Sequence, residues 1–294
     1  MDQVSEGVRR ITAPNPGPMT HTGTQTYLVG TGAVALVDPG PADARHAAAI
    51  RAALRPGERI CHILVTHAHL DHTPLARPLA ADLGIAVHAF GDARAGRSDA
   101  MRALAEAGAH LGGGEGVDAA FDPDEVLADG DVLTGGDWSL EAWHTPGHMA
   151  NHLSFVWREG GVGFSGDHVM DWATTLVSPP DGDLTAFMAS LRGMQGRVGG
   201  LMLLPGHGAP VRDAEARVAE LIAHREGREA QILAALAAGP ARVAALTEAI
   251  YTEVAPMLLP AAARNVFAHL IDLHGRGLVE TEGLPGADAL WTVR

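Results

Sequence analysis

The sequence predicts an α/β protein built in layers, followed by a smaller helical domain. Up to about residue 213, strand patterns occur both in hairpins and in alternation with helical patterns. That mixture is typical of a mixed sheet system with helices on its outer faces. Beyond this point long helical patterns replace the strands. We therefore expect two domains, residues 1–213 and residues 214–294.

The first elements follow from short apolar runs separated by turn residues. TQTYLVGTGAVALVDPG (24–40) predicts two strands around a Gly-Thr-Gly turn, ending at Asp38. Residues 43–54 have a helical pattern, and ICHILV (60–65) predicts a short strand of the buried kind. A helix is expected from about Thr73, because the proline that follows is tolerated in a first helical turn.

The middle of the chain alternates between strands and a long glycine-rich insert. GIAVHAF (84–90) predicts a strand, whereas residues 91–120 predict a mobile, partly helical loop. A loop of this length is often a lid or a binding loop, and a plain surface insertion is the alternative. Three strands are expected within 131–166, then a helix over about 183–195 and a strand at 201–204.

Three helical patterns and a terminal hairpin predict a winged-helix-like fold for residues 214–294. The helices are expected in DAEARVAELIAHREGREAQILAALAAG, ARVAALTEAIYTEV and AAARNVFAHLIDLHGRG, and LVETEG should pair with ALWTVR. This region has three more acidic residues than arginines. A winged helix that binds DNA needs a basic face. We therefore expect this domain to serve in packing or in formation of a homodimer.

Composition excludes several classes of protein. The formal charge of −14 disfavours a nucleic-acid-binding surface, because phosphate contacts need clustered positive charge. Every one of the 21 basic residues is an arginine, so a P-loop and a lysine Schiff base are both excluded. With a single cysteine, Cys61, no internal disulfide can form. No signal-peptide pattern and no 18-residue apolar run occur, so we expect a cytoplasmic protein without a membrane span.

Four potential metal ligands crowd into six positions directly after the strand predicted at 60–65. THAHLDH supplies His67, His69, Asp71 and His72, and imidazole and carboxylate are the ligands that zinc and similar metals take in hydrolytic sites. Alternate residues of an extended backbone point the same way, so the first two histidines can face one point. The other two residues lie at the turn into the helix and can face a second point. A lone histidine is usually structural, but this spacing predicts a site for two adjacent metals.

Later strand ends supply the remaining ligands. TPGHMANH contains His148, FSGD contains Asp167 and LLPGHG contains His207, each in or beside a glycine turn that can aim a side chain. A carboxylate such as Asp167 can bridge two cations, which leaves coordination open for water on both. The two expected ligand sets are His67, His69, His148 and Asp167 for the first metal, and Asp71, His72, His207 and Asp167 for the second.

The motifs T-H-x-H-x-D-H, T-P-G-H, G-D and P-G-H-G, in this order over about residues 12–212, resemble the metallo-β-lactamase-fold hydrolases. The resemblance implies a four-layer αβ/βα sandwich with the same two ligand sets at one edge, and a hydrogen-bonding role for Asp38. The opening NPGPMTHTGTQTYLVG, the Thr174-Thr175 pair and the helical C-terminal region are most similar to the lactamase-beta-2-like subgroup. Zinc β-lactamases of this fold commonly carry a cysteine near the second metal, whereas Cys61 is expected inside a strand and is no ligand.

These observations predict a dinuclear metal-dependent hydrolase. A hydroxide that bridges two divalent ions would attack the carbonyl of a small-molecule thioester, ester or lactone. We expect zinc, with iron and manganese as alternatives, because histidine and carboxylate ligands suit all three. Asp71 is expected to orient the nucleophile or take its proton, and Asp167 to bridge the metals.

Substrate contacts are expected from residues just past the metal edge. The candidates are His168, Trp172 and Thr175, with a packing role as the alternative for His168. His152 is expected to support the site rather than to bind metal. These assignments depend on sequence proximity alone.

Other functions remain as alternatives. A metal-dependent endoribonuclease, as found in part of the lactamase-beta-2-like subgroup, would need a track of arginines, but only Arg94, Arg97 and Arg102 lie close together. A non-catalytic metal scaffold is disfavoured, since a structural zinc site is closed and needs only four ligands. A redox role would need a flavin or rubredoxin module, which the sequence does not show. A small molecule is therefore the expected partner, and nucleic acid is not.

Overall fold

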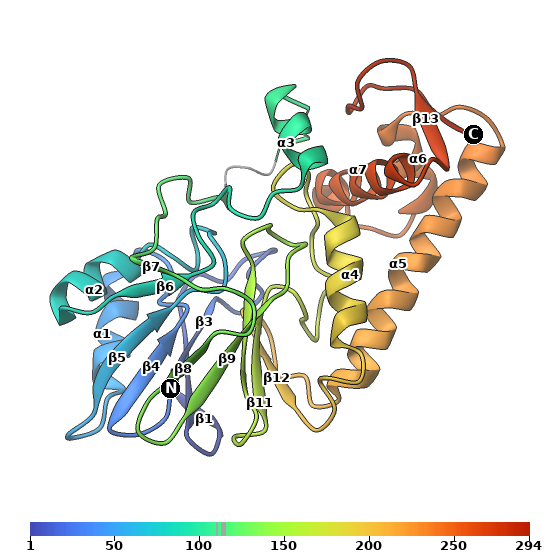
Figure 1. The fold of residues 1–294 in the computed structure, drawn as a ribbon. Coiled ribbons are helices and arrows are strands. Elements are labelled where there is room, and N and C mark those ends of the chain that lie inside the picture. Colours follow the sequence, from blue (N-terminus) through green and yellow to red (C-terminus); the bar gives the residue numbers. More distant parts are fainter. Residues whose placement is uncertain (110, 113–115) are drawn as a thin grey trace.

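The computed structural model describes residues 1–109, 111–112 and 116–294, and two sheets face each other in its larger part (Figure 1). The first sheet takes its strands in chain order: β1 (Asp2–Ser5), β2 (Val8–Thr12), β3 (Gln25–Val29), β4 (Ala33–Val37), β5 (Arg59–Leu64), β6 (Val87–Ala89) and β7 (Glu125–Val126). Strands β1 to β4 are antiparallel, and β4 to β7 are parallel. The hairpin predicted at 24–40 and the strand predicted at 60–65 are confirmed.

The second sheet is built from the later strands. Its order is β12 (Met202–Pro205), β11 (Val162–Gly166), β10 (Leu153–Trp157), β9 (Ser139–His144) and β8 (Val132–Thr134). Strand β12 pairs in parallel with β11, and the other neighbours are antiparallel. Strands β9, β11 and β12 therefore point the same way, so their carboxyl ends lie at one edge of the sheet.

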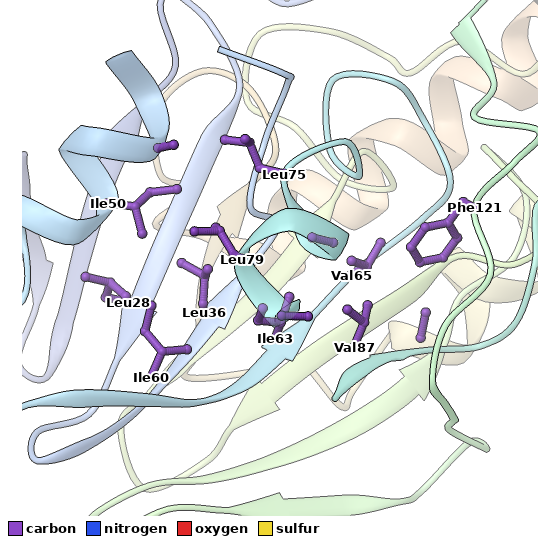
Figure 2. Packing of buried hydrophobic residues seen from close by; sticks show 14 of the residues in the cluster. Leu28, Leu36, Ile50, Ile60, Ile63, Val65, Leu75, Leu79, Val87 and Phe121 are labelled. Carbon is purple, nitrogen blue, oxygen red and sulfur yellow. The ribbon is translucent and has the colours of Figure 1, made fainter. Parts of the chain in front are cut away.

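Helices cover the outer face of each sheet, which gives the four layers that the motifs implied (Figure 1). Helices α1 (Ala44–Ala52) and α2 (Ala76–Leu83) pack on the first sheet through Ile50 and Leu79, which meet Leu36 and Ile63 (Figure 2). Helices α4 (Leu184–Met194) and α5 (Ala214–Ala237) pack on the second sheet. Helix α2 begins three residues later than Thr73 because the preceding segment forms turns at the end of the histidine cluster.

The space between the sheets is filled by side chains from both. Tyr27, Leu64, Phe155, Phe164 and Leu204 belong to one buried cluster. Tyr27 also donates a hydrogen bond from its hydroxyl to the carbonyl of Pro205, at 2.7 Å, across the two sheets. This contact ties the end of β12 to the first sheet beside the edge at which the metal ligands gather.

The C-terminal region has the winged-helix architecture that the sequence predicted. Helix α5 is followed by α6 (Val243–Ile250), the short 3₁₀ helix η2 (Pro256–Leu258), α7 (Leu259–Gly275), and the hairpin β13 (Val279–Thr281) with β14 (Trp291–Val293). Trp291 is fully buried against this helical core. The domain boundary at residue 213 stays a prediction. No helix in the described ranges is long and apolar enough to cross a membrane.

The insert predicted at 91–120 is partly helical, and its helix is anchored. Helix α3 (Asp99–Glu106) buries Met101 and Leu104 in the apolar cluster of the C-terminal region. Ser98 caps the helix and donates a hydrogen bond to Asp183 at 2.8 Å. The role of the insert as a lid stays a prediction, and its residues 110 and 113–115 lie outside the described residues.

Candidate metal centre

The potential metal ligands follow the carboxyl ends of strands from both sheets. The histidine cluster follows β5, His148 follows β9, Asp167 follows β11 directly, and His207 follows β12. Because these ends meet at one edge of the sandwich, the chain brings together side chains up to 140 positions apart between His67 and His207. The seven predicted ligands lie together there in two groups, His67, His69, His148 and Asp167, and Asp71, His72 and His207.

The donor atoms of the first group lie close enough together to surround one ion. His69 Nδ1 lies 2.9 Å from His67 Nε2 and 3.1 Å from His148 Nε2. Asp167 Oδ2 lies 3.7 Å from His148 Nε2 and 4.0 Å from His67 Nε2. Ligand atoms around a tetrahedral zinc ion at about 2.0–2.1 Å are roughly 3.3 Å from one another. These four donors therefore surround a point at which one ion fits.

The second group lies beside the first and shares Asp167 with it. Asp71 Oδ2 is 3.3 Å from His72 Nε2 and 3.2 Å from His207 Nε2. His207 Nε2 is also 3.3 Å from Asp167 Oδ2, and Asp167 Oδ1 is 3.7 Å from His72 Nε2. The Asp167 carboxylate thus contacts imidazoles of both groups, which is the position that a bridging ligand needs.

Two buried polar atoms among the candidate ligands lack hydrogen-bond partners within the described part of the chain, as expected of atoms that bind a cation. His72 Nε2 and Asp167 Oδ1 are buried and have no hydrogen-bond partner among the described residues. Buried polar atoms are nearly always paired, and an orphan calls for an explanation such as an ion. Both atoms point into the space between ligand donors of the second group. A divalent cation there would satisfy both, so the donor set fits metal.

Hydrogen bonds on the far side of the imidazoles fix which ring nitrogen faces the metal space. His72 Nδ1 donates to Asp38 Oδ2 at 2.9 Å, and Asp38 also accepts from the Thr66 backbone N–H at 2.8 Å. His148 Nδ1 donates to the Leu176 carbonyl at 2.7 Å. In both rings the Nε2 atom is left free to bind metal, as is usual for histidine ligands. The supporting role expected of Asp38 is confirmed.

His152 holds the Asp167 backbone, as expected of a supporting residue. Its Nε2 accepts from the Asp167 N–H at 3.2 Å, and its Nδ1 then donates to Thr145 Oγ1 at 2.9 Å. The ring also stacks on His67, with centroids 5.1 Å apart. Gly166 has a φ of 48°, and a Cβ there would lie 2.5 Å from His152 Nε2. Glycine is therefore required at the turn that presents Asp167.

Burial keeps the imidazoles of the first group neutral. It lowers the pKa of His69 to about 3, and it lowers the pKa values of His67 and His148 as well. Neighbouring imidazoles reinforce the effect for His67 and His69. Neutral imidazole is the form that binds a metal. The first group is therefore ready to accept a cation across the physiological pH range.

Carboxylates dominate the electrostatics of the second group. Burial alone would lower the pKa of His207, but Asp167 and Asp71 outweigh it and raise the pKa to about 9. The pKa of His72 is likewise raised, by Asp71 and Asp38. The carboxylates therefore demand positive charge at this point. Without metal, protons bound by the imidazoles of His72 and His207 balance the negative charge of these carboxylates. A bound divalent cation would balance it instead of the protons.

The structure does not support direct substrate contact by two of the three expected residues. His168 is fully buried and packs on Phe187, with ring centroids 4.6 Å apart. Thr175 is also buried, and its hydroxyl donates to the Asp167 carbonyl at 2.9 Å. Trp172 is 37% exposed and lies against His21, with centroids 4.9 Å apart. Of the three residues Trp172 alone is accessible, and substrate contact stays a prediction.

A cavity of about 230 Å³ opens onto both ligand groups. His69, Asp71, His148, Asp167 and His207 form its polar base. The other described side chains that line it are Met19, Thr20, Leu176, Ser178, Asp181 and Arg264. The sequence analysis missed these residues as contacts because most lie in loops without a local pattern. Arg264 did carry a signal, since it is the one charged residue of the mostly apolar helical run AAARNVFAHL, whose only other polar residues are Asn265 and His269.

Comparisons with known proteins identify the family of the chain. The family model described as the metallo-beta-lactamase superfamily matches residues 19–215, and the beta-lactamase associated winged helix domain matches residues 243–291. The chain therefore belongs to the metallo-beta-lactamase superfamily and is an enzyme of that fold. It is 33% identical over 268 residues to an atrochrysone carboxyl ACP thioesterase from Aspergillus fumigatus, covering 85% of this chain and 75% of that protein.

Solved structures with the same two-part architecture show the fold. A beta-lactamase domain protein from Burkholderia ambifaria has a TM-score of 0.80 at 24% identity, covering 100% of this chain and 93% of the other. A metallo-beta-lactamase family protein from Thermus thermophilus has a TM-score of 0.76 at 24% identity, covering 99% and 100%. The winged helix domain is therefore part of the architecture shared with these proteins.

Proposed function

We propose that the protein hydrolyses a small-molecule thioester at a centre of two divalent metal ions. The position of Asp167 carries the proposal, since its Oδ2 atom lies 3.3 Å from His207 Nε2 and 3.7 Å from His148 Nε2, one imidazole from each ligand group. Zinc is the metal we expect, and iron and manganese remain alternatives because the donors suit all three. Ester and lactone carbonyls would be attacked by the same chemistry.

The residues of the chain position the reacting groups. When bound, a pair of divalent cations lowers the pKa of water and polarises a carbonyl oxygen. Asp71 lies at the cavity and accepts a hydrogen bond from Thr24 Oγ1 at 2.8 Å, so its carboxylate is held in one orientation. We infer that Asp71 orients the attacking water and takes its proton.

The named relatives support a thioester within the broader class of carbonyl substrates. The Aspergillus fumigatus relative is named an acyl-carrier thioesterase, and its match extends over most of both chains. We take from that name only the thioester bond. The cavity itself suits a compact acyl group, because about 230 Å³ is below the roughly 300–1,000 Å³ typical of ligand clefts.

The arginines near the site argue against the ribonuclease alternative. Arg97 is paired with Asp181, and Arg102 is paired with Asp99. Their charges are therefore neutralised within the protein and do not form a track for a polyanion. A ribonuclease needs such a track, because phosphate contacts supply most of the affinity for RNA.

Metal analysis and a substrate panel test the proposal on one sample. We expect about two equivalents of metal per chain, turnover of a small thioester, and no RNA cleavage. Asp71→Ala should abolish thioester turnover while the fold survives, which a circular dichroism spectrum would check. A metal-loaded protein that cleaves RNA but leaves thioesters, esters and lactones intact would refute the thioesterase assignment.

A further inference from the structure

One cationic side chain of the C-terminal region lines the cavity of the metal centre. Arg264 lies in the second turn of helix α7 and shares the cavity with His148, Asp167 and His207. Among the described residues that line it, Arg264 is the one arginine. The winged helix domain therefore contributes one positive charge to a site whose ligands all come from the sandwich.

Within the described part of the chain, no hydrogen bond or ion pair engages the Arg264 guanidinium. The side chain is half-buried, and its Nε atom is buried without a partner. Two other arginines, by contrast, have partners in the protein. Arg225 donates hydrogen bonds to the carbonyls of Thr174 and Thr175. Arg97 pairs with Asp181, the acidic residue that also lines the cavity. Withdrawing a charged group partly from water is costly unless an opposite charge pairs with it. Arg264 is therefore available to a ligand.

The backbone that carries Arg264 is fixed to the metal centre. Its neighbour Asn265 accepts hydrogen bonds from the Val177 N–H at 3.1 Å and from Arg225 Nη1 at 3.0 Å. The Leu176 carbonyl in the same segment accepts from His148 Nδ1. Helix α7 is thus connected through one loop segment to a metal ligand. A guanidinium held on a rigid helix can select a ligand by geometry.

We propose that Arg264 binds a carboxylate on the acyl part of the substrate, so that the preferred substrate is a monothioester of a dicarboxylic acid. This inference rests on the proposed thioesterase function and specifies its substrate class. A guanidinium donates two parallel hydrogen bonds to a carboxylate, which gives both affinity and orientation. The cavity is small, so an anion that reaches Arg264 lies close to the reacting carbonyl. That places the anion on the acyl group rather than on a long thiol arm.

Binding of hydrolysis products tests the proposal without turnover. The probes are the α,ω-dicarboxylates from succinate to suberate and the monocarboxylates of equal length, titrated by calorimetry into the zinc-loaded protein. We expect at least one dicarboxylate to bind tenfold or more tighter than its monocarboxylate. Arg264→Met should remove this preference, a loss of roughly 10- to 100-fold for hydrogen bonds to a charged group. Arg264→Lys should retain part of it.

The matched control is Arg242→Met, which removes an exposed arginine of the same domain that does not line the cavity. It should leave the preference unchanged. Thermal unfolding and metal content should be unaltered in Arg264→Met, because the side chain has no partner to lose, and Arg264→Gln serves as a second variant if that protein is unstable. No preference in the wild type for any chain length, or the same preference in Arg264→Met and Arg264→Gln, would overturn the proposal.

Kinetics then identify the source of the anion. With an N-acetylcysteamine thioester, Arg264→Met should raise KM roughly 10- to 100-fold for a carboxylated acyl group and leave KM for a neutral acyl group unchanged. An effect confined to a neutral acyl group on a phosphorylated pantetheine thiol would place the anion on the thiol and overturn the acyl assignment. Absence of turnover with every thioester would refute the proposed function, while the dicarboxylate titration would still decide the role of Arg264.

Discussion

Asp167 is the residue on which both ligand groups depend. Its Oδ2 atom is 3.3 Å from His207 Nε2 and 3.7 Å from His148 Nε2, and its backbone is held by His152 and Thr175. Asp167→Ala should therefore lower bound metal from about two equivalents to one or none and abolish hydrolysis. Elemental analysis and a thioester assay measure both effects, with circular dichroism as the check on folding. Retention of two metals with full activity would contradict the bridging assignment.

His148 and His152 occupy similar positions in TPGHMANH but make different contacts. The first directs Nε2 into the ligand group, whereas the second accepts from the Asp167 backbone. His148→Ala should therefore strip the first metal, while His152→Ala should cost only about 10–100-fold in metal affinity or activity, as is typical of supporting residues. Metal titration of the two variants compares them directly. A reversed order of effects would require the two roles to be exchanged.

His269 is a buried titratable residue away from the metal ligands. It is 1% exposed, neither ring nitrogen has a partner among the described residues, and burial lowers its pKa to about 3. The charged groups around it are Arg225, Arg228 and Arg276, with His224 adding to them, and Glu229 and Asp272 line the adjoining cavity. In the unfolded chain its pKa would be about 6.5.

This difference predicts acid lability. Below about pH 6.5 the unfolded chain takes up a proton at His269 that the folded protein does not, so the free energy of unfolding falls as the pH decreases. By pH 5 the loss from this residue is about 2 kcal/mol. Urea unfolding of His269→Leu should therefore show a smaller decrease between pH 7 and pH 5 than the wild type. The control is His21→Leu at an exposed position, and an equal decrease in both variants would count against the prediction.

At the scale of residues, the sequence predicted which candidate metal ligands lie together, but not the residues that surround them. His67, His69, Asp71 and His72 lie so close in sequence that few roles other than metal binding explain them. Thr175 illustrates the limit: its φ of 61° turns the side chain back toward Asp167, and no sequence pattern reports that direction. Contact residues depend on backbone turns and on packing between distant segments.

At the scale of elements, helices α5 and α7 hold the loop that supports the metal ligands. Arg225 of α5 is fully buried and donates to the carbonyls of Thr174 and Thr175 at 2.6 and 2.5 Å. Asn265 of α7 accepts from the Val177 N–H. The loop between these contacts carries the hydroxyl that binds the Asp167 carbonyl and the carbonyl that binds His148. The two helices therefore position metal ligands that they do not contact.

Asn265→Ala should weaken this support. The change leaves the Val177 N–H and one Arg225 donor without their acceptor, and unsatisfied buried donors cost about 1–3 kcal/mol each. We expect a lower free energy of unfolding and faster loss of metal to a chelator. Urea unfolding and chelator kinetics measure these effects, with Gln231→Ala at an exposed position of α5 as the control. Lower stability with unchanged metal loss would show that the loop does not support the centre.

The elements themselves were largely predictable from the sequence, because their apolar runs are bounded by glycine and proline. The hairpin β3–β4 and the three helices of the C-terminal region lie where the patterns placed them. Helix α3 shows why the remainder was not predictable: its Met101 and Leu104 belong to an apolar cluster whose other fully buried members begin at Ile232. The helical spacing of apolar residues shows which face of a helix is buried, but not which other segment it packs against.

At the scale of the molecule, two domains complete one site. The sandwich supplies every candidate metal ligand among the described residues, and α7 of the winged helix domain supplies the arginine of the cavity. Around this local positive charge the chain carries 35 acidic and 21 basic residues. Its long-range field therefore repels polyanions, while the centre attracts a single anionic group.

This combination predicts how hydrolysis depends on salt. A protein that contacts six or more phosphates loses about 10³-fold or more in affinity between 50 and 200 mM salt, whereas a substrate with one charge, bound in a partly buried cavity, is screened far less. We therefore expect kcat/KM for an anionic thioester to change less than about threefold over that range. RNA should bind weakly at about 150 mM salt, because Arg97 and Arg102 of the insert are already paired with acidic residues.

A side-by-side titration of thioester turnover and RNA cleavage between 50 and 200 mM salt makes the comparison on the metal-loaded protein. The Asp71→Ala variant identifies any activity that does not come from this centre. RNA cleavage that falls steeply with salt, disappears in Asp71→Ala and occurs without thioester turnover would mean that local phosphate contacts outweigh the field of the whole molecule. Thioester turnover that is nearly independent of salt would instead show that one half-buried arginine, and not the net charge, governs substrate binding.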